Sequence, residues 1–141
     1  MGMTNKLLVI AALVLALPMS ADAENFSQPA PAERKLTVAK VQSFDFGRSY
    51  VHTEERKEVF RVAQLWRQRK QWWKITVEGH GYVPGNEEAS IELGEKRAQR
   101  VRDLLVRFGV DPRFIVAVGH SRSEPGRYVE VSVDTCHACR R

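Results

Sequence analysis

Strand-like and helix-like segments alternate from residue 36 onward, and few folds accommodate the order in which they occur. Residues 128–133 alternate apolar and polar side chains, as a strand with one buried face does. Val59, Val62 and Trp66 recur at the spacing of one helical face. In this way the chain is predicted to contain strands at 36–47, 73–78, 114–118 and 128–133, and helices at 53–70 and 86–108. The order β-α-β-α-β-β predicts one domain of the α/β (α+β) class, with two helices packed on one sheet.

The connections between these segments predict how the strands pair. Each helix links two successive strands, and such crossovers can place parallel strands side by side. The turn at 121–126 is short, which favours an antiparallel pair formed by the last two strands. We therefore expect a mixed sheet. Thr53 and Asn86 each precede two glutamates and are predicted to cap the helices, and Gly109 is predicted to end the second helix in the left-handed conformation.

The first 23 residues have the pattern of a secretory signal peptide. Lys6 precedes an apolar run at 7–17, and the small residues Ala21 and Ala23 follow at the spacing of a cleavage site. The run is shorter than the roughly 20 residues that cross a bilayer. The expected division is a signal peptide at 1–23, a Pro-containing linker at 24–35, a domain at 36–135 and a C-terminal tail at 136–141.

The charge of the chain suits an anionic partner. The formal net charge is +5, and removal of residues 1–23 takes away Lys6 and Asp22, so the balance stays the same. Cell wall, lipid headgroups and nucleic acid are the anionic candidates. Export makes nucleic acid the least suitable of these, and we expect no nucleic acid among the partners and a periplasmic location.

The two cysteines, Cys136 and Cys139, form a C-x-x-C pair close to the C-terminus. Arg140 stands where a haem attachment site has histidine, and no helix follows as in thioredoxin-like sites. Zinc would need His137 or His120 to complete four ligands. In an oxidising compartment, a small disulfide between the two cysteines is the favoured prediction, and redox chemistry there is the one enzymatic alternative.

An ordered set of short segments points to a known family. The set keeps its spacing along the chain and consists of 44–47, Gly79 and His80, Gly85, Leu93, Arg97 and Ala98, 108–110 and 129–131. It resembles the OmpA-like domain, the C-terminal module of OmpA and MotB, over about residues 37–133. The resemblance implies a non-catalytic module of the cell envelope that binds peptidoglycan, without cofactor or metal, at the outer membrane or cell wall.

The resemblance also implies where the ligand binds. Family members hold the ammonium and the carboxylate of diaminopimelate with an aspartate after the second strand and an arginine on the following helix. Arg97 matches that arginine, whose planar fork suits a carboxylate. Tyr82 stands in place of the aspartate and offers a hydrogen bond or a cation–π contact instead. The expected binding residues are Gly79, His80, Gly81, Tyr82 and Arg97, and Arg127 matches a family arginine before the last strand.

Two alternatives stay open at this point. Arg97 has no acidic partner at helical spacing, so a purely structural role would need a carboxylate from elsewhere in the fold. His80 suits a structural role in its loop better than a catalytic or metal-binding one. The other function is a domain that has lost its ligand and serves as a protein-interaction or structural subunit, through Tyr82, the Trp72–Trp73 pair or the basic surface. No carboxylate pair or Ser-His-Asp order indicates an enzyme.

Overall fold

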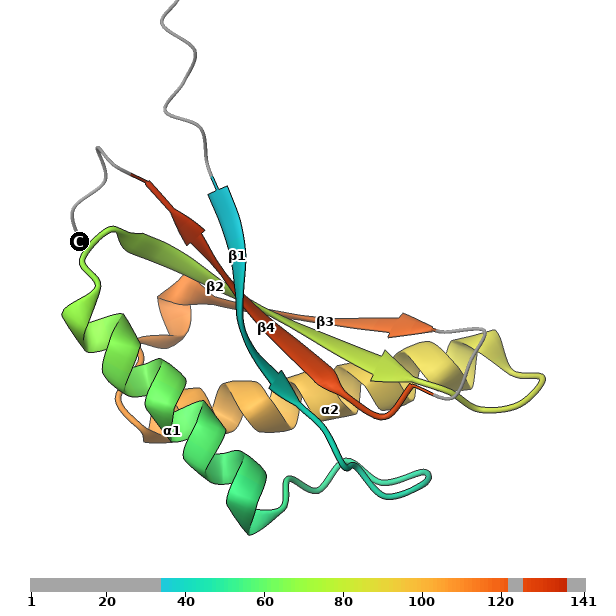
Figure 1. The fold of residues 1–141 in the computed structure, drawn as a ribbon. Helices are drawn as coiled ribbons and strands as arrows, with labels where there is room; N and C mark the ends of the chain where they lie inside the picture. The colour runs from blue at the N-terminus through green and yellow to red at the C-terminus, as the bar shows by residue number, and fades with distance from the viewer. Residues whose placement is uncertain (1–33, 122–125, 137–141) are drawn as a thin grey trace, which may run out of the picture.

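The computed structural model describes residues 34–121 and 126–136. Its elements are β1 (Arg34–Val41), α1 (Thr53–Gln68), β2 (Trp72–Gly81), α2 (Glu87–Arg107), a short 3-10 turn η1 (Pro112–Phe114), β3 (Ile115–Ser121) and β4 (Val129–Thr135). The predicted order β-α-β-α-β-β is confirmed (Figure 1). The expected signal peptide, residues 24–33 of the expected linker, and Cys139 lie outside the described residues.

The sheet is mixed, as predicted, but two of the predicted pairings are wrong. The strand order is β1-β4-β2-β3, with β2 and β3 parallel and β4 antiparallel to both of its neighbours. The last two strands are therefore not adjacent, because β4 occupies the place between β1 and β2. For the same reason β1 and β2, which the first crossover was expected to place side by side, do not pair, whereas the expected parallel pair of β2 and β3 is present. The connection from 122 to 128 spans up to about 23 Å when extended, which is enough to pass the end of β2. Because β4 is a central strand, its residues Val129, Val131 and Val133 are completely buried.

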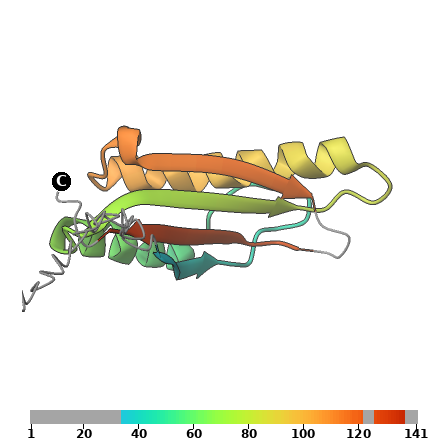
Figure 2. The same ribbon diagram turned by 90° about the horizontal axis from the view of Figure 1, so that it is seen from above.

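Both helices cover the same face of the sheet (Figures 1 and 2). Val59, Val62 and Trp66 of α1 and Val101 and Leu105 of α2 are buried against the inner side chains of the strands. This burial of apolar area is the main stabilising contribution to a domain of this size. The fold class predicted from the sequence is confirmed as a two-layer α+β domain.

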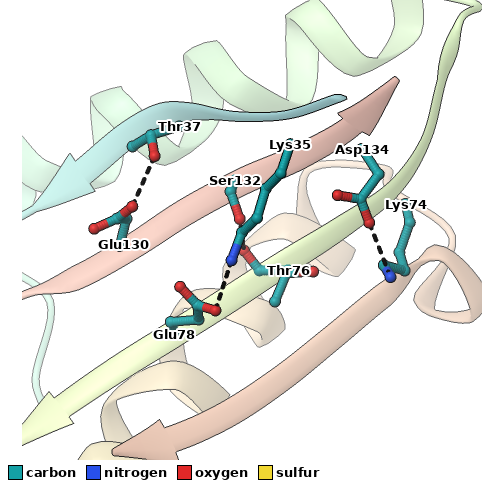
Figure 3. Close-up of polar contacts among 8 residues, drawn as sticks. All are labelled: Lys35, Thr37, Lys74, Thr76, Glu78, Glu130, Ser132 and Asp134. Carbon is teal, nitrogen blue, oxygen red and sulfur yellow. Dashed lines mark hydrogen bonds and ion pairs between the residues drawn. The ribbon is translucent and has the colours of Figure 1, made fainter. Parts of the chain in front are cut away.

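The opposite face of the sheet carries polar cross-strand contacts (Figure 3). Lys35 donates to Glu78 at 2.7 Å and Thr37 donates to Glu130 at 2.7 Å. Lys74 forms an ion pair with Asp134 at 2.8 Å. These contacts belong to a sheet with one solvated face, on which such pairs each contribute a few tenths of a kcal/mol up to about 1 kcal/mol.

Several boundaries differ from the sequence-based expectation, and three of the differences lie in β1, β2 and at the start of α1. β1 ends at Val41 instead of continuing to residue 47, because Ser43 adopts a positive φ of 62° and turns the chain out of the sheet. β2 continues through Gly81, beyond the predicted end at Glu78. Helix α1 is preceded by His52 as its N-cap residue, so Thr53 is the first helical residue and does not cap it.

Two other local predictions are confirmed. The Asn86 side chain accepts a hydrogen bond from the Ala89 main-chain N–H at 2.9 Å, which caps α2. Gly109 has φ of 96° just after α2, where a residue with a side chain is strained. The capping and the termination of a helix depend on residues only a few positions apart, so both can be predicted from the sequence.

The first and last described residues lie at one end of the sheet, and the loops that follow β1 and β2 lie at the other end. Arg34 pairs with Thr135, so β1 starts beside the end of β4. The loop after β1, the loop after β2 and the residues before β4 therefore gather at the opposite end of the sheet (Figure 1). This topology brings segments that are far apart in the sequence to a common site.

Candidate functional site

A small pocket of about 200 Å³ lies at the loop end of the sheet. It is lined by Phe46, Gly47, Tyr82, Arg97 and Arg127. These residues come from four segments: the loop after β1, the residue after β2, the middle of α2 and the residue two before β4. Tyr82 and Arg97, which the family resemblance relates to one ligand, thus line the same pocket.

Arg97 is a buried residue of the domain, with only 1% of its surface exposed. Its guanidinium donates to four main-chain carbonyl oxygens, those of Arg48 (2.9 Å), His80 (2.8 Å), Gly126 (3.2 Å) and Asp45 (3.2 Å). Arg97 therefore ties α2 to three other segments around the pocket. No carboxylate was needed for this structural role, contrary to the sequence-based argument, because main-chain carbonyls supply the acceptors.

The guanidinium of Arg97 has five N–H groups, of which four are directed at these carbonyls. One N–H of Nη2 has no acceptor among the described residues. Burial lowers the pKa of Arg97 from its ordinary value, and the nearby positive charge of Arg127 lowers it further. An arginine remains charged under these conditions. Arg97 thus offers a ligand one N–H and a positive charge. Bidentate binding of a ligand would require Arg97 to give up one of its hydrogen bonds to a main-chain carbonyl.

Phe44 and Phe46 surround this arginine from the loop after β1. The centre of the Phe44 ring lies 5.1 Å from Cζ of Arg97, and Phe44 is almost fully buried. Phe46, in contrast, is 68% exposed at the edge of the pocket. An exposed aromatic side chain beside a polar pocket is a common feature of ligand-binding surfaces. The sequence had placed both residues in the first strand, so it gave no signal for this role.

Arg127 is the solvent-accessible cation of the pocket. It is exposed, whereas Tyr82 is half-buried and Arg97 is buried. No acidic side chain is among the residues that line the pocket. The pocket is therefore positively charged, with an aromatic edge, and its chemistry suits a carboxylate.

Gly79, His80 and Gly81 lie in β2, beside the pocket, and are not among its lining residues. The His80 ring packs against Tyr128 at 4.5 Å between centroids and against His120 at 5.5 Å. Its main-chain N–H donates to the Tyr128 carbonyl at 3.1 Å, while its own carbonyl accepts from Arg97. His80 thus has the structural surroundings that the sequence favoured.

The two glycines allow helix α2 to lie directly on β2. A Cβ atom at Gly79 would be 1.9 Å from the Gly94 carbonyl oxygen, and one at Gly81 would be 2.0 Å from the Ser90 carbonyl oxygen. Real Cβ atoms do not approach so closely, so only glycine fits at either position. The close approach of the helix sets the depth at which Arg97 sits beneath the loops.

The sequence assigned no role to Ser90, which holds the loop that carries Tyr82. Its hydroxyl accepts from the Val83 main-chain N–H at 2.8 Å and lies 2.7 Å from the Asn86 carbonyl oxygen, to which it donates. Ser90 is 3% exposed. A serine bonding back to the carbonyl four residues earlier is common in helices, but the additional bond to Val83 depends on the fold.

The remaining sequence-based candidates lie elsewhere. Trp72 is buried and Trp73 half-buried, so the two do not form an exposed pair. Cys136 is buried, and its predicted disulfide partner Cys139 lies outside the described residues, so the disulfide stays a prediction. Within residues 34–121 and 126–136, no group of three His, Cys, Asp or Glu side chains is placed to hold a metal ion. The helices of this part of the chain are too short or too polar to cross a membrane.

Comparison with known proteins supports one family. The model of the OmpA family matches residues 43–133. The peptidoglycan-associated lipoprotein of Brucella melitensis is 30% identical over 98 residues, which cover 70% of this chain and 56% of that protein. Outer membrane porin F of Pseudomonas aeruginosa is 36% identical over 101 residues, or 69% of this chain and 27% of the porin. The chain thus matches about half of the lipoprotein and a smaller part of the porin.

A solved structure has the same arrangement of elements. The crystal structure of the peptidoglycan-associated lipoprotein from Burkholderia pseudomallei has a TM-score of 0.58 and 25% sequence identity. The match covers 67% of this chain and 88% of that chain. Both the sequence and the fold of the described domain therefore agree with the same group of proteins.

Proposed function

The chain belongs to the OmpA family, and from this premise we propose that it binds peptidoglycan, without catalysis, at the pocket of Phe46, Gly47, Tyr82, Arg97 and Arg127. The observation that carries the proposal is the convergence of two arginines and Tyr82 from separate segments at one pocket. The similarity to two lipoproteins that are named for their association with peptidoglycan supports it. The proposed location is the periplasmic side of the cell envelope.

The ligand group proposed for this pocket is a carboxylate of the stem peptide, with that of diaminopimelate as the leading candidate. Arg127 is exposed, and its fork can take the carboxylate through two N–H groups. Arg97 adds its remaining N–H and its charge from below. In this proposal Arg97 is a minor direct contact and a major positioning residue, while Arg127 is the principal anchor.

The ammonium group of diaminopimelate meets a weaker partner here than in a site with an aspartate. A neutral phenol offers an acceptor or a cation–π contact worth about 0.5–2 kcal/mol. The lost charge-assisted bond is worth about 1.5–3 kcal/mol. The lost bond alone corresponds to about ten- to a hundredfold in affinity, and the phenol contact offsets part of this loss. We therefore expect wall binding that is weaker, by up to about a hundredfold, than with aspartate at position 82. Gly79, His80 and Gly81 are proposed to hold Tyr82 and Arg97 in place.

A second candidate function is a structural or protein-interaction subunit that has lost the ligand. Two observations favour it: four of the five N–H groups of Arg97 are already bonded, and Tyr82 replaces the acidic residue. If this second function is correct, an aspartate at position 82 does not restore binding to peptidoglycan. One pair of variants therefore separates the two functions.

The Tyr82→Asp variant is expected to bind peptidoglycan sacculi more tightly than the native chain, by about tenfold or more, because it supplies a charge for the ammonium. Arg127→Gln is expected to weaken binding by about tenfold, because it removes the exposed anchor. Both are measured by co-sedimentation with diaminopimelate-type sacculi at two salt concentrations.

The matched control is Arg113→Gln, which removes the same charge from an exposed arginine paired with Asp111 far from the pocket lining. It is expected to bind sacculi as the native chain does. If Arg113→Gln and Arg127→Gln reduce binding equally, the interaction is only a general attraction between charges. If Tyr82→Asp also gives no gain, the second function is favoured.

A further inference from the structure

A second and larger cavity, of about 480 Å³, lies on the helical side of the domain. Four arginines line it: Arg48 from the loop after β1, Arg56 from α1, and Arg100 and Arg107 from α2. Arg100 and Arg107 are seven residues apart and so lie on the same face of the helix, two turns from each other. Three separate segments thus direct like charges to one cavity.

These four arginines lack the ion pairs that several other cations of the described residues form. Ion pairs hold Lys35, Lys57, Arg61, Lys74, Lys96 and Arg113. Within residues 34–121 and 126–136, none of the four cavity arginines has an acidic partner within ion-pair distance. Asp103 also lines the cavity, but its carboxylate accepts from Gln99 at 2.8 Å and approaches Arg102 at 4.0 Å.

Gathering unpaired positive charges around one concave surface costs electrostatic energy, which a bound anion would offset. Guanidinium groups suit the oxygens of a phosphate particularly well, because their planar fork donates two parallel hydrogen bonds. Tyr50, 59% exposed at the same cavity, adds a hydroxyl donor and an aromatic surface. The cavity volume is within the range of about 300–1,000 Å³ that is usual for small-ligand sites.

We propose that this cavity is a binding site for a phosphate-bearing ligand, either a soluble phosphate compound or the headgroup of an anionic lipid. The site is distinct from the pocket of Tyr82, because Phe46 and Gly47 line that pocket while Arg48 and Tyr50 line this cavity. One loop therefore separates two cationic sites of different size. Arg97 supports both, since it fixes the main chain at Arg48 through a bond of 2.9 Å.

The test is titration of the full chain with inorganic pyrophosphate by calorimetry, together with flotation on vesicles of phosphatidylglycerol or of phosphatidylcholine. The cavity variant is Arg100→Gln with Arg107→Gln. The control is Lys96→Gln with Arg113→Gln, which removes the same charge outside the cavity. All four side chains are exposed, so both variants are expected to fold, as circular dichroism would verify.

The expected result is saturable binding of pyrophosphate by the native chain and the control, at least tenfold weaker in the cavity variant. The native chain and the control could instead bind phosphatidylglycerol vesicles, more tightly than the cavity variant does, and not bind pyrophosphate. That result would identify a lipid headgroup as the source of the phosphate. The proposal is wrong if neither probe binds saturably, or if both variants lose binding to the same extent.

Discussion

Replacing Arg97 by alanine is expected to lower the free energy of unfolding by about 4 kcal/mol or more, a large part of the stability of a domain this size. The change removes four hydrogen bonds from a charged donor to main-chain carbonyls. Hydrogen bonds to charged groups contribute about 1.5–3 kcal/mol each, although neighbouring bonds do not add fully. It also leaves the carbonyls of His80 and Gly126 without this donor and empties the space beside Phe44.

Urea denaturation of the Arg97→Ala and Arg127→Ala variants measures this difference in the free energy of unfolding. Arg127→Ala is the matched control, since it removes an arginine from the same pocket but from an exposed side chain, and it is expected to change stability by no more than about 0.5 kcal/mol. Equal stability of the two variants would contradict the structural role of Arg97. The same reasoning makes Arg97→Ala unsuitable for testing ligand binding, because lost binding would follow from lost structure.

Gly79→Ala is expected to destabilise the domain by about 3 kcal/mol or more, through displacement of α2 from the sheet. The added methyl group would lie 1.9 Å from the Gly94 carbonyl oxygen and 2.8 Å from the Ala98 main-chain nitrogen. Both contacts are with backbone, which cannot move aside without shifting the helix, and overpacking of this kind costs about 1–3 kcal/mol or more. Thermal unfolding followed by circular dichroism measures the loss.

The control for this glycine is its neighbour on the same strand. Glu78→Ala removes only an ion pair with Lys35 on the solvated face of the sheet, with 2.7 Å between the two charged groups, and is expected to cost about 1 kcal/mol or less. If Gly79→Ala is no more destabilising than Glu78→Ala, the helix does not need to approach the strand as closely as described.

Much of the fold could be predicted because its determinants are local. Asn86 is a good cap with two glutamates behind it, Gly109 meets the demand for positive φ, and the valines of β4 alternate with polar residues. Each of these signals lies within a few residues. The order of the strands could not be predicted in this way, because β4 pairs with β1 and β2 rather than with the strand that precedes it in the chain.

The members of the candidate pocket were predictable only in part, since Gly79, His80 and Gly81 do not line it and Phe46 and Gly47 do. Spacing singled out Tyr82 and Arg97, and both line one pocket. The acceptors of Arg97 are main-chain oxygens at residues 45, 48, 80 and 126, which only the folded chain brings together. Carbonyls have no sequence signature, so a search for an acidic partner could not find them. The arginine cavity was missed for a similar reason, because its members are scattered from residue 48 to residue 107.

The most direct test of the central claim is a titration of the isotope-labelled chain with a muropeptide that contains diaminopimelate, followed by amide chemical shifts. The account predicts saturable shifts at Gly47, Tyr82 and Arg127, at the loop end of the sheet, and none at Arg34 or Thr135 at the other end. No saturable shifts at these three amides, or shifts centred on another surface, would contradict it.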